Sequence, residues 1–390
     1  MKMAFFAAFF HYRYKLKVSF VGIKLFPEGN PKQKCRKRGL VMTTDKELNP
    51  MNVMKPQNLS LHTTGETPSL TTFEMGKLWA TYLGNSMSIQ ILGYFLQHCD
   101  DEDIRLLLEN GLALSKDFTQ RIEGFFNKGN FPIPLGFTKD DVNLGAPRLY
   151  EDEFYAHYLK YAAKAGMSLY AVAVPLVMRE DTREFFIYCN QCTTILLGQI
   201  NNVLMEKKLI AKPPIIPTPE GILKIDKQNY LNGFLGDVRP LQALEIIHLW
   251  DNIENNTTSK ALLLGFYQIV KDQNIKALFK RGLNMTDKAV KQYKEKLHIE
   301  QIHSPAYLDH LVTTSTYPPF SDRIMLFHKV DMFAMKIRAF GNSLAVTARR
   351  DIDTLYIRTL VNIGLFVDDG MNILIDKGWF ESPPTAYERD

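Results

Sequence analysis

The sequence has few cysteines, and the short motifs of several common catalytic sites are absent from it. Four cysteines among 390 residues are too few for a disulfide-stabilised scaffold. There is no P-loop, no GxGxxG after a strand, no GxSxG and no HExxH. These absences argue against phosphate chemistry on a glycine-rich loop.

Two of the cysteines, Cys189 and Cys192, form the pair CNQC. The pair lies inside the helix-like run REFFIYCNQCTTILLGQINNVLMEKK, without the preceding strand that a thioredoxin-type motif needs. A zinc site would need a second pair, which does not occur. We therefore expect two reduced thiols packed on a helix, in a protein of the cytoplasm.

The N-terminal part lacks both a long apolar run and acidic residues. The run MKMAFFAAFF is far shorter than the roughly 20 apolar residues of a membrane span, and no small-residue cleavage site follows it. Residues 1–41 hold ten of the 47 basic residues but one of the 42 acidic residues, so the net charge of +5 comes from this segment. The rest of the chain is mildly acidic, which argues against nucleic-acid binding. No membrane span is expected.

We predict a disordered leader over residues 1–67, first basic and then polar. Codons for Lys37 to Gly39 can form a ribosome-binding-like tract just before Met42. Translation from Met42 is therefore an alternative, in which residues 1–41 are not part of the native protein.

The chain matches itself at a spacing of 171 residues, which falls to 170 in the second half of each repeat. The stretch FEMGKLW, ending at Trp79, falls on LEIIHLW, ending at Trp250, although the whole chain has 3 Trp. The match predicts two units, residues 68–214 and 239–390, joined by a linker with Pro and Gly over residues 215–238.

Each unit contains four long segments with apolar residues at the spacing of one helix face. The predicted helices are 70–98, 101–129, 151–178 and 181–209 in the first unit, and 241–270, 273–299, 321–348 and 351–378 in the second. Short connections link the first helix to the second and the third to the fourth. About 20 residues link the second helix to the third, which is enough to run the length of a bundle. The predicted fold class is all-α: two tandem ferritin-like four-helix bundles, each made of two helical hairpins joined by a long crossover. The chain length favours two separate hydrophobic cores.

Acidic residues stand where several of these helices should begin. We expect Asp181 and Asp351 to cap the fourth helix of each unit by accepting bonds from free backbone N–H groups. The stretch YFLQHCDDEDI offers metal ligands, but its acids fit a capping role in the first turn of the next helix better. The candidate ligands are His98, Asp100, Asp101, Glu102 and Asp103.

Six stretches of the sequence resemble one known family. They are FEMGKLWATYLGNSMSIQILGYFLQH, FPIPLGFTKDDVNLGAPRLY, LIAKPPIIPTPE, FLGDVRPLQALEIIHLW, PPFSDRIMLFH and DDGMNILIDKGWFESPPTAYERD. On these stretches the chain resembles a duplicated Bacillus-type family known as domain of unknown function 3231, over about residues 43–390. The resemblance implies tandem ferritin-like bundles and brings no established activity or catalytic residues. The spore-forming organisms that carry the family imply a link to sporulation or stress, and spore association as an alternative location.

Ferritin-like bundles are known for binding two metals through a Glu on each of two helices and a Glu-x-x-His on each of the other two. The stretch EIIH supplies one such pair, Glu245 and His248, whereas Lys77 replaces the imidazole in the first unit. A divalent metal on Glu245 and His248, joined by His328 or Asp331, is therefore one hypothesis. The other is structural, because a Glu near a helix N-terminus interacts favourably with the helix dipole.

Arg179 and Arg349 occupy equivalent places, each two residues before an Asp. Pairing with that Asp is one interpretation, and an anion site at each corner is the other.

Two well-matched bundles without a repeated set of ligands predict a soluble, non-enzymatic binding or assembly element. Such a protein would bind an unknown protein partner or itself, without a cofactor. The alternatives are a metal-dependent ferritin-like oxidoreductase using Glu245 and His248, and a protein that binds a small ligand in a bundle core.

Overall fold

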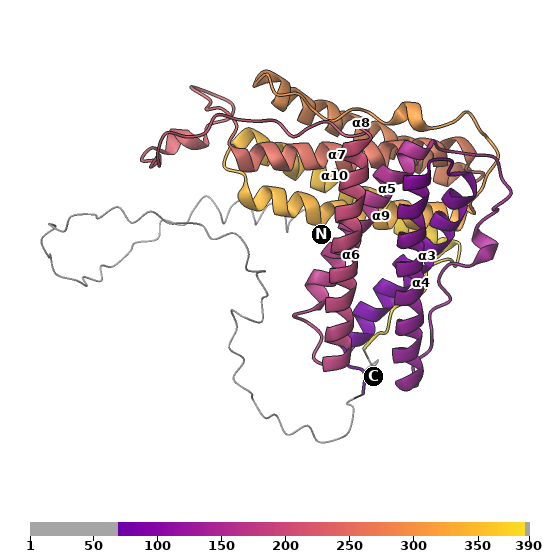
Figure 1. Ribbon diagram of the computed structural model, residues 1–390. Helices are drawn as coiled ribbons and strands as arrows, with labels where there is room; N and C mark the ends of the chain where they lie inside the picture. Colours follow the sequence, from indigo (N-terminus) through magenta and orange to yellow (C-terminus); the bar gives the residue numbers. More distant parts are fainter. Residues whose placement is uncertain (1–68, 387–390) are drawn as a thin grey trace, which may run out of the picture. The chain divides into compact units, whose positions relative to one another are not determined.

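The computed structural model describes residues 69–386, and the predictions for the leader lie outside these residues. The described residues form eight α-helices, labelled in Figure 1, and three short 3-10 helices, with two isolated β-bridges and no strand. The first repeat contains α3 (Thr72–His98), α4 (Glu102–Lys128), η1 (Lys139–Asp141), α5 (Asp152–Ala173) and α6 (Glu180–Glu206). The linker contains η2 (Gln228–Leu231), and the second repeat contains α7 (Ala243–Ile269), α8 (Gln273–Ile299), η3 (Asp309–Leu311), α9 (Asp322–Val346) and α10 (Arg350–Asp376). The all-α prediction is confirmed.

The predicted helices agree with the observed ones to within a few residues, except at the end of α5. This helix ends at Ala173, several residues before the predicted end at 178. Pro175 follows closely. A proline lacks the N–H that would continue the helix and disfavours a helical conformation in the residue before it.

Carboxylates fix the beginnings of four helices. Glu74 completes a capping box at the start of α3, and Glu245 completes one at the start of α7. Asp101 and Asp272 cap α4 and α8, each accepting bonds from two backbone N–H groups. The capping prediction for Asp101 is therefore confirmed.

The prediction that Asp181 and Asp351 cap the fourth helices is wrong in position, because neither is the N-cap residue, although Asp181 Oδ1 does accept a bond from the Thr182 backbone N–H at 2.8 Å. Arg179 and Arg349 occupy the N-cap positions of α6 and α10, and neither side chain makes a capping bond. Each Asp lies in the first turn and binds the arginine two residues before it, at 2.6 Å in α6 and 2.9 Å in α10. A bidentate guanidinium is the stronger partner for the carboxylate, which stays favourably placed at the positive end of the helix dipole.

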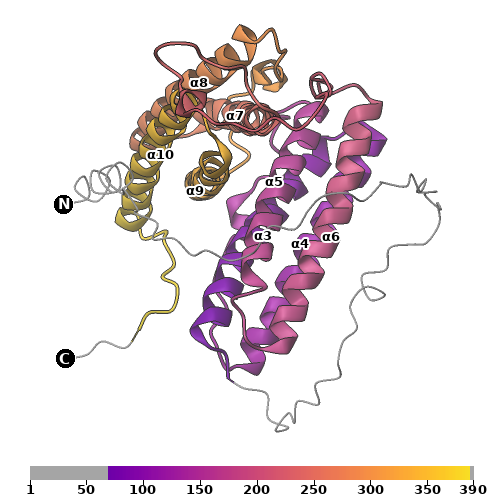
Figure 2. The ribbon, with the colours of Figure 1, turned by 90° about the vertical axis from the view of Figure 1, so that its left-hand side faces the viewer.

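Each repeat is a four-helix bundle of two hairpins, α3–α4 with α5–α6 and α7–α8 with α9–α10 (Figures 1 and 2). Residues 129–151 and 300–321 are the long crossovers between the hairpins. The crossovers pair with each other, because Tyr150 forms an antiparallel bridge with Val312. Next to them, Arg323 Nη1 binds Asp141 Oδ2 at 2.9 Å. The two repeats are therefore joined by their crossovers as well as by the linker.

The expected separation into one core per repeat is not observed. One large cluster of buried side chains includes residues of both repeats, and a smaller cluster fills the remainder of the first bundle. Aromatic rings connect the repeats: Phe320 lies 5.0 Å from Tyr94 and 5.9 Å from Phe266, measured between ring centroids. The crossovers carry apolar residues into the space between the bundles, so burial is shared across the duplication.

The CNQC pair lies on α6, with Cys189 buried, Cys192 partly buried and both thiols free, as expected. Burial raises the pKa of Cys189 well above its usual value, which keeps the thiol protonated and unreactive. None of the helices between residues 69 and 386 has both the length and the apolarity that crossing a membrane requires.

Candidate functional site

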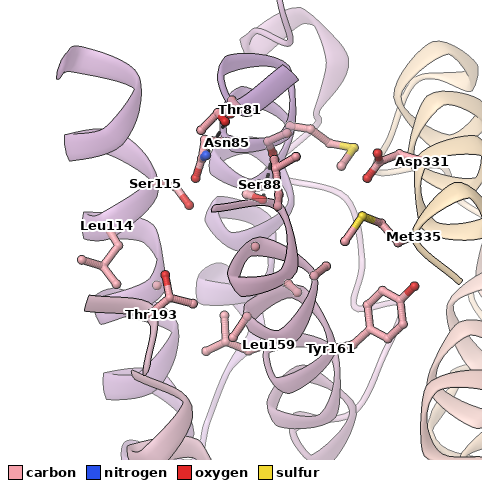
Figure 3. Close-up of a pocket in the computed structure, with 18 of the residues that line it drawn as sticks. Thr81, Asn85, Ser88, Leu114, Ser115, Leu159, Tyr161, Thr193, Asp331 and Met335 are labelled. Carbon is pink, nitrogen blue, oxygen red and sulfur yellow. Dashed lines mark hydrogen bonds between the residues drawn. The ribbon is translucent and has the colours of Figure 1, made fainter. Parts of the chain in front are cut away.

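A cavity of about 230 Å³ lies in the core of the first bundle (Figure 3). All four helices of that bundle contribute to its wall, and α9 of the second bundle closes one side. Small residues leave the space open. They are Gly84 on α3, Gly111 on α4, and Ala162, Ala165 and Gly166 on α5.

The second bundle has lysines at positions equivalent to the cavity wall. With the spacing of 170 residues, Leu159 matches Lys329 and Gly166 matches Lys336. Leu159 and Gly166 both line the cavity of the first bundle. In the second bundle, the long lysine side chains at these positions reach from α9 to α7.

Both lysines are almost completely buried, at 0% and 2% exposure for Lys329 and Lys336, and neither has an acidic partner within residues 69–386. Lys329 Nζ donates to Ser259 Oγ at 2.9 Å, and Lys336 Nζ donates to Asn256 Oδ1 at 3.0 Å. Burial lowers the pKa of Lys336 to about 7, and burial together with the nearby Lys336 lowers the pKa of Lys329 well below its usual value. These lysines tie α9 to α7.

The α3 wall of the cavity carries polar side chains whose hydrogens are already used within the first bundle. Thr81 Oγ1 donates to Lys77 O at 2.8 Å, and Ser88 Oγ donates to Gly84 O at 3.0 Å. Asn85 Nδ2 donates to Thr81 O at 2.8 Å and to the Tyr170 hydroxyl at 3.3 Å. The atoms left for a ligand on this wall are oxygen acceptors.

Asp331 brings a carboxylate from α9 to the cavity, on the side that faces α3 and α5 (Figure 3). No hydrogen bond or ion pair reaches this carboxylate from the described part of the chain. The surrounding protein raises the pKa of Asp331 to about 6, against the opposing effect of Arg338. At neutral pH the cavity therefore contains a largely ionised acid.

His328, named above as an additional metal ligand, is buried beside the same cavity. Its Nε2 lies 2.7 Å from the Tyr158 hydroxyl, a hydrogen bond between the two bundles. Burial, with the neighbouring Lys329, lowers the pKa of His328 to about 3, so the imidazole is neutral.

Glu245 serves the helix ends rather than an open site. Arg239 donates to both of its oxygens, at 2.7 and 2.8 Å, and the backbone N–H groups of Ala348 and Arg349 donate to it at 3.1 and 3.0 Å. Burial opposes ionisation of Glu245, but the bonds from Arg239 and the backbone outweigh it and lower the pKa.

His248 lies near Glu245 in the sequence but is not brought together with Asp331. Its Nδ1 is 3.3 Å from Ser343 Oγ on α9. Asp331 stands 12 residues earlier on the same helix, which is about 18 Å along the helix axis. Between residues 69 and 386 no group of three or more His, Cys, Asp or Glu is arranged to hold a metal ion. Metal binding by Glu245 and His248 stays a prediction.

The two arginine corners bind acids of this chain. Arg179 pairs with Asp181, and Arg349 pairs with both Asp351 and Glu300. The local-pairing interpretation is confirmed, and an anion site at either corner stays a prediction.

No sequence motif marks the cavity residues. Asp331 was predicted as a possible metal ligand beside Glu245 and His248, whereas in the structure it lines a cavity of the first bundle. The available signal was the replacement of Leu159 and Gly166 by two lysines in the second repeat, which becomes visible when the repeats are compared position by position.

Comparisons with known proteins identify a family but no activity. The model of the family described as "Protein of unknown function (DUF3231)" matches twice, over residues 60–222 and 230–390. No curated protein matches the chain. A crystal structure described as a "putative spore coat protein" from Bacillus halodurans is 17% identical, with a TM-score of 0.35, and the match covers 38% of this chain and 98% of that chain.

Proposed function

Because this chain belongs to the family matched twice along its length, whose description assigns no activity, we propose a function from the geometry: the first bundle binds a small organic molecule in its core. The observation that supports this proposal is the cavity of about 230 Å³ at a place where the second bundle has two buried lysines.

The size and lining of the cavity suit a small ligand. Pockets for drug-sized molecules measure about 300–1,000 Å³ and combine an apolar wall with a few polar groups. This cavity is slightly smaller, with three alanines and Gly166 on α5 and polar oxygens on α3. The second bundle, in this proposal, supplies α9 as a fixed wall.

A filling mutation tests the proposal. A Cβ added at Gly84, which lines the cavity, meets no atom within 4 Å, so Gly84→Phe places a ring in open space. We expect at least one of three probes, benzylamine, benzyl alcohol and benzoate, to bind the wild-type protein in saturation-transfer NMR, and Gly84→Phe to abolish that binding. Gly93→Phe is the matched control, because Gly93 is on the same helix, also has open space and does not line the cavity.

Two outcomes contradict the proposal. One is the absence of binding by all three probes at millimolar concentration. The other is unchanged binding by a folded Gly84→Phe protein, with folding verified by circular dichroism.

A second candidate function is assembly through the linker. Apolar side chains there are more than four-fifths exposed, which is unusual for so many neighbouring residues. They are Ile215, Ile222, Leu223 and Leu235. In this alternative the linker makes contact with a second copy of the chain.

Light scattering after size exclusion tests the assembly candidate. We expect the wild-type chain to form an oligomer that the triple change Ile222→Ser, Leu223→Ser and Leu235→Ser dissociates. Leu106→Ser, at an exposed apolar residue of α4, should leave the oligomer intact. A monomeric wild-type protein rules this candidate out.

A further inference from the structure

The ligand class follows from the charge and the hydrogen-bonding groups that face the cavity. This inference rests on the proposed function, since it specifies the molecule that the first bundle binds. It combines an unpaired acid on α9, acceptor atoms on α3 and an apolar wall on α5.

Asp331 supplies the cavity with a carboxylate that no described residue pairs. A carboxylate that receives no hydrogen bond from the protein attracts a cation, and the attraction is stronger beside a protein wall than in bulk water. Its neighbours in sequence, Val330 and Met332, are buried, whereas Asp331 is exposed at the cavity. A cation in the cavity would supply the partner that the described chain does not.

The α3 wall is the second element. Thr81, Asn85 and Ser88 donate their hydrogens to groups of the first bundle. Only the lone pairs of their oxygens are then available to a ligand. An ammonium group carries up to three N–H donors and no acceptor, so it matches a wall of acceptors and a carboxylate. On this wall and at Asp331, a carboxylate or phosphate ligand would meet lone pairs and a negative charge; the hydroxyls of Ser115 and Thr193 belong to the walls on α4 and α6.

Arg338 is the other charged residue among those that line the cavity, and it stands apart from Asp331. The two are separated by seven residues of α9, which is about 10 Å along the axis. Arg338 also lowers the pKa of Lys77, which lies one turn before Thr81, so its charge is felt at the beginning of α3. Arg338 therefore acts on Asp331, whose pKa it lowers, as well as on the beginning of α3, but it forms no ion pair with the acid among the described residues.

We propose that the cavity binds a small organic ammonium compound, with its nitrogen at Asp331 and its apolar body against Ala162 and Ala165. The size of the cavity limits this compound to a compact amine. The charge that selects it comes from the second repeat, while the space comes from the first.

Isothermal titration with benzylamine and its neutral isostere benzyl alcohol tests the ligand class. In the wild-type protein we expect benzylamine to bind at least tenfold more tightly than benzyl alcohol, because a hydrogen bond to a charged group stabilises by about 1.5–3 kcal/mol. Asp331→Asn should weaken benzylamine binding roughly 10- to 100-fold. The same change should leave benzyl alcohol binding within about twofold.

The pH dependence gives a second readout that a merely structural role would not produce. Benzylamine affinity of the wild-type protein should fall between pH 8 and pH 5, because protonation of Asp331 removes the charge, whereas Asp331→Asn should show no such fall. Glu109→Gln, which removes an exposed acid of α4, is the control and should behave as the wild-type protein does.

The outcomes separate the two proposals. Equal affinity for benzylamine and benzyl alcohol, or no effect of Asp331→Asn, overturns the ammonium proposal and leaves the binding function in place. Failure of every probe to bind overturns both.

Discussion

The two bundles have the same hairpins and crossovers but differ in the space between their first and third helices. In the first bundle, small residues on α5 leave a cavity beside α3. In the second bundle, two lysines of α9 cross the equivalent space and bind Ser259 and Asn256 on α7. One backbone arrangement thus supports either a hollow core or a core closed by buried polar contacts, and side-chain length at two positions decides between them.

The largest contrast should come from the capping acids of the two repeats. Glu245 has Arg239 as an ion-pair partner as well as backbone donors, whereas Glu74 binds the Thr71 side chain and backbone N–H groups. We expect Glu245→Gln to lower the free energy of unfolding by about 3–5 kcal/mol, because it breaks an ion pair whose carboxylate is fully buried and leaves the half-buried Arg239 without an acidic partner. Glu74→Gln should cost about 1–3 kcal/mol. Urea denaturation measures both, and an equal loss would contradict the contrast.

A smaller effect concerns the pH dependence of stability. The folded pKa of Lys336 is about 7 and its unfolded value is near 10.5, so the unfolded chain binds the proton more tightly between these limits. The folded state therefore loses stability as the pH falls from 10.5 to 7, by at most about 1.4 kcal/mol per pH unit, and loses no more from this group below pH 7.

Lys336→Met should remove that part of the slope. Lys164, Asp251 and His248 border a neighbouring cavity that Lys336 also lines, and they are retained in the variant. Lys288→Met, at an exposed lysine of α8, is the control. Denaturation at pH 7, 8 and 9 measures the slope, and identical slopes for the wild-type protein and Lys336→Met would refute the assignment.

The smallest expected contrast is at two equivalent glycines. A Cβ on Gly282 would lie 2.8 Å from a ring carbon of Phe366, and a Cβ on Gly111 would lie 2.9 Å from Leu159 Cδ1. Leu159 borders the cavity and has room to move, whereas the Phe366 ring is fully buried. We expect Gly282→Ala to cost about 1–3 kcal/mol and Gly111→Ala under about 1 kcal/mol, by thermal denaturation. A reversed order would show that the cavity does not relieve crowding.

The helices were predictable because their determinants are local. Apolar periodicity gave the eight segments, and Asp101 was recognisable as a cap from its position before an apolar run. The position of Asp181 was mispredicted because α6 begins one residue earlier, at Glu180, and the main partner of the carboxylate is the Arg179 side chain, which residue type alone does not reveal.

The candidate site was not predictable, because its parts come from distant places in the sequence. Asp331 belongs to the second repeat but lines a cavity of the first. An internal repeat suggests that matching residues have matching surroundings, and it does not suggest that a residue of one repeat lines a cavity of the other. The prediction of separate cores failed for the same reason, since Phe320 packs against rings of both repeats. The duplicated sequence describes each bundle and does not describe how the bundles meet.

The pairing of the two crossovers also constrains the time course of folding. Tyr150 finds its bridge partner Val312 only after a further 162 residues have been made, and contacts of such long range slow folding. At typical rates of about 5–20 residues per second, the ribosome needs on the order of ten seconds to supply them. During this interval the crossover of the first bundle has no partner. The first bundle therefore reaches its final structure only after the second repeat has been synthesised.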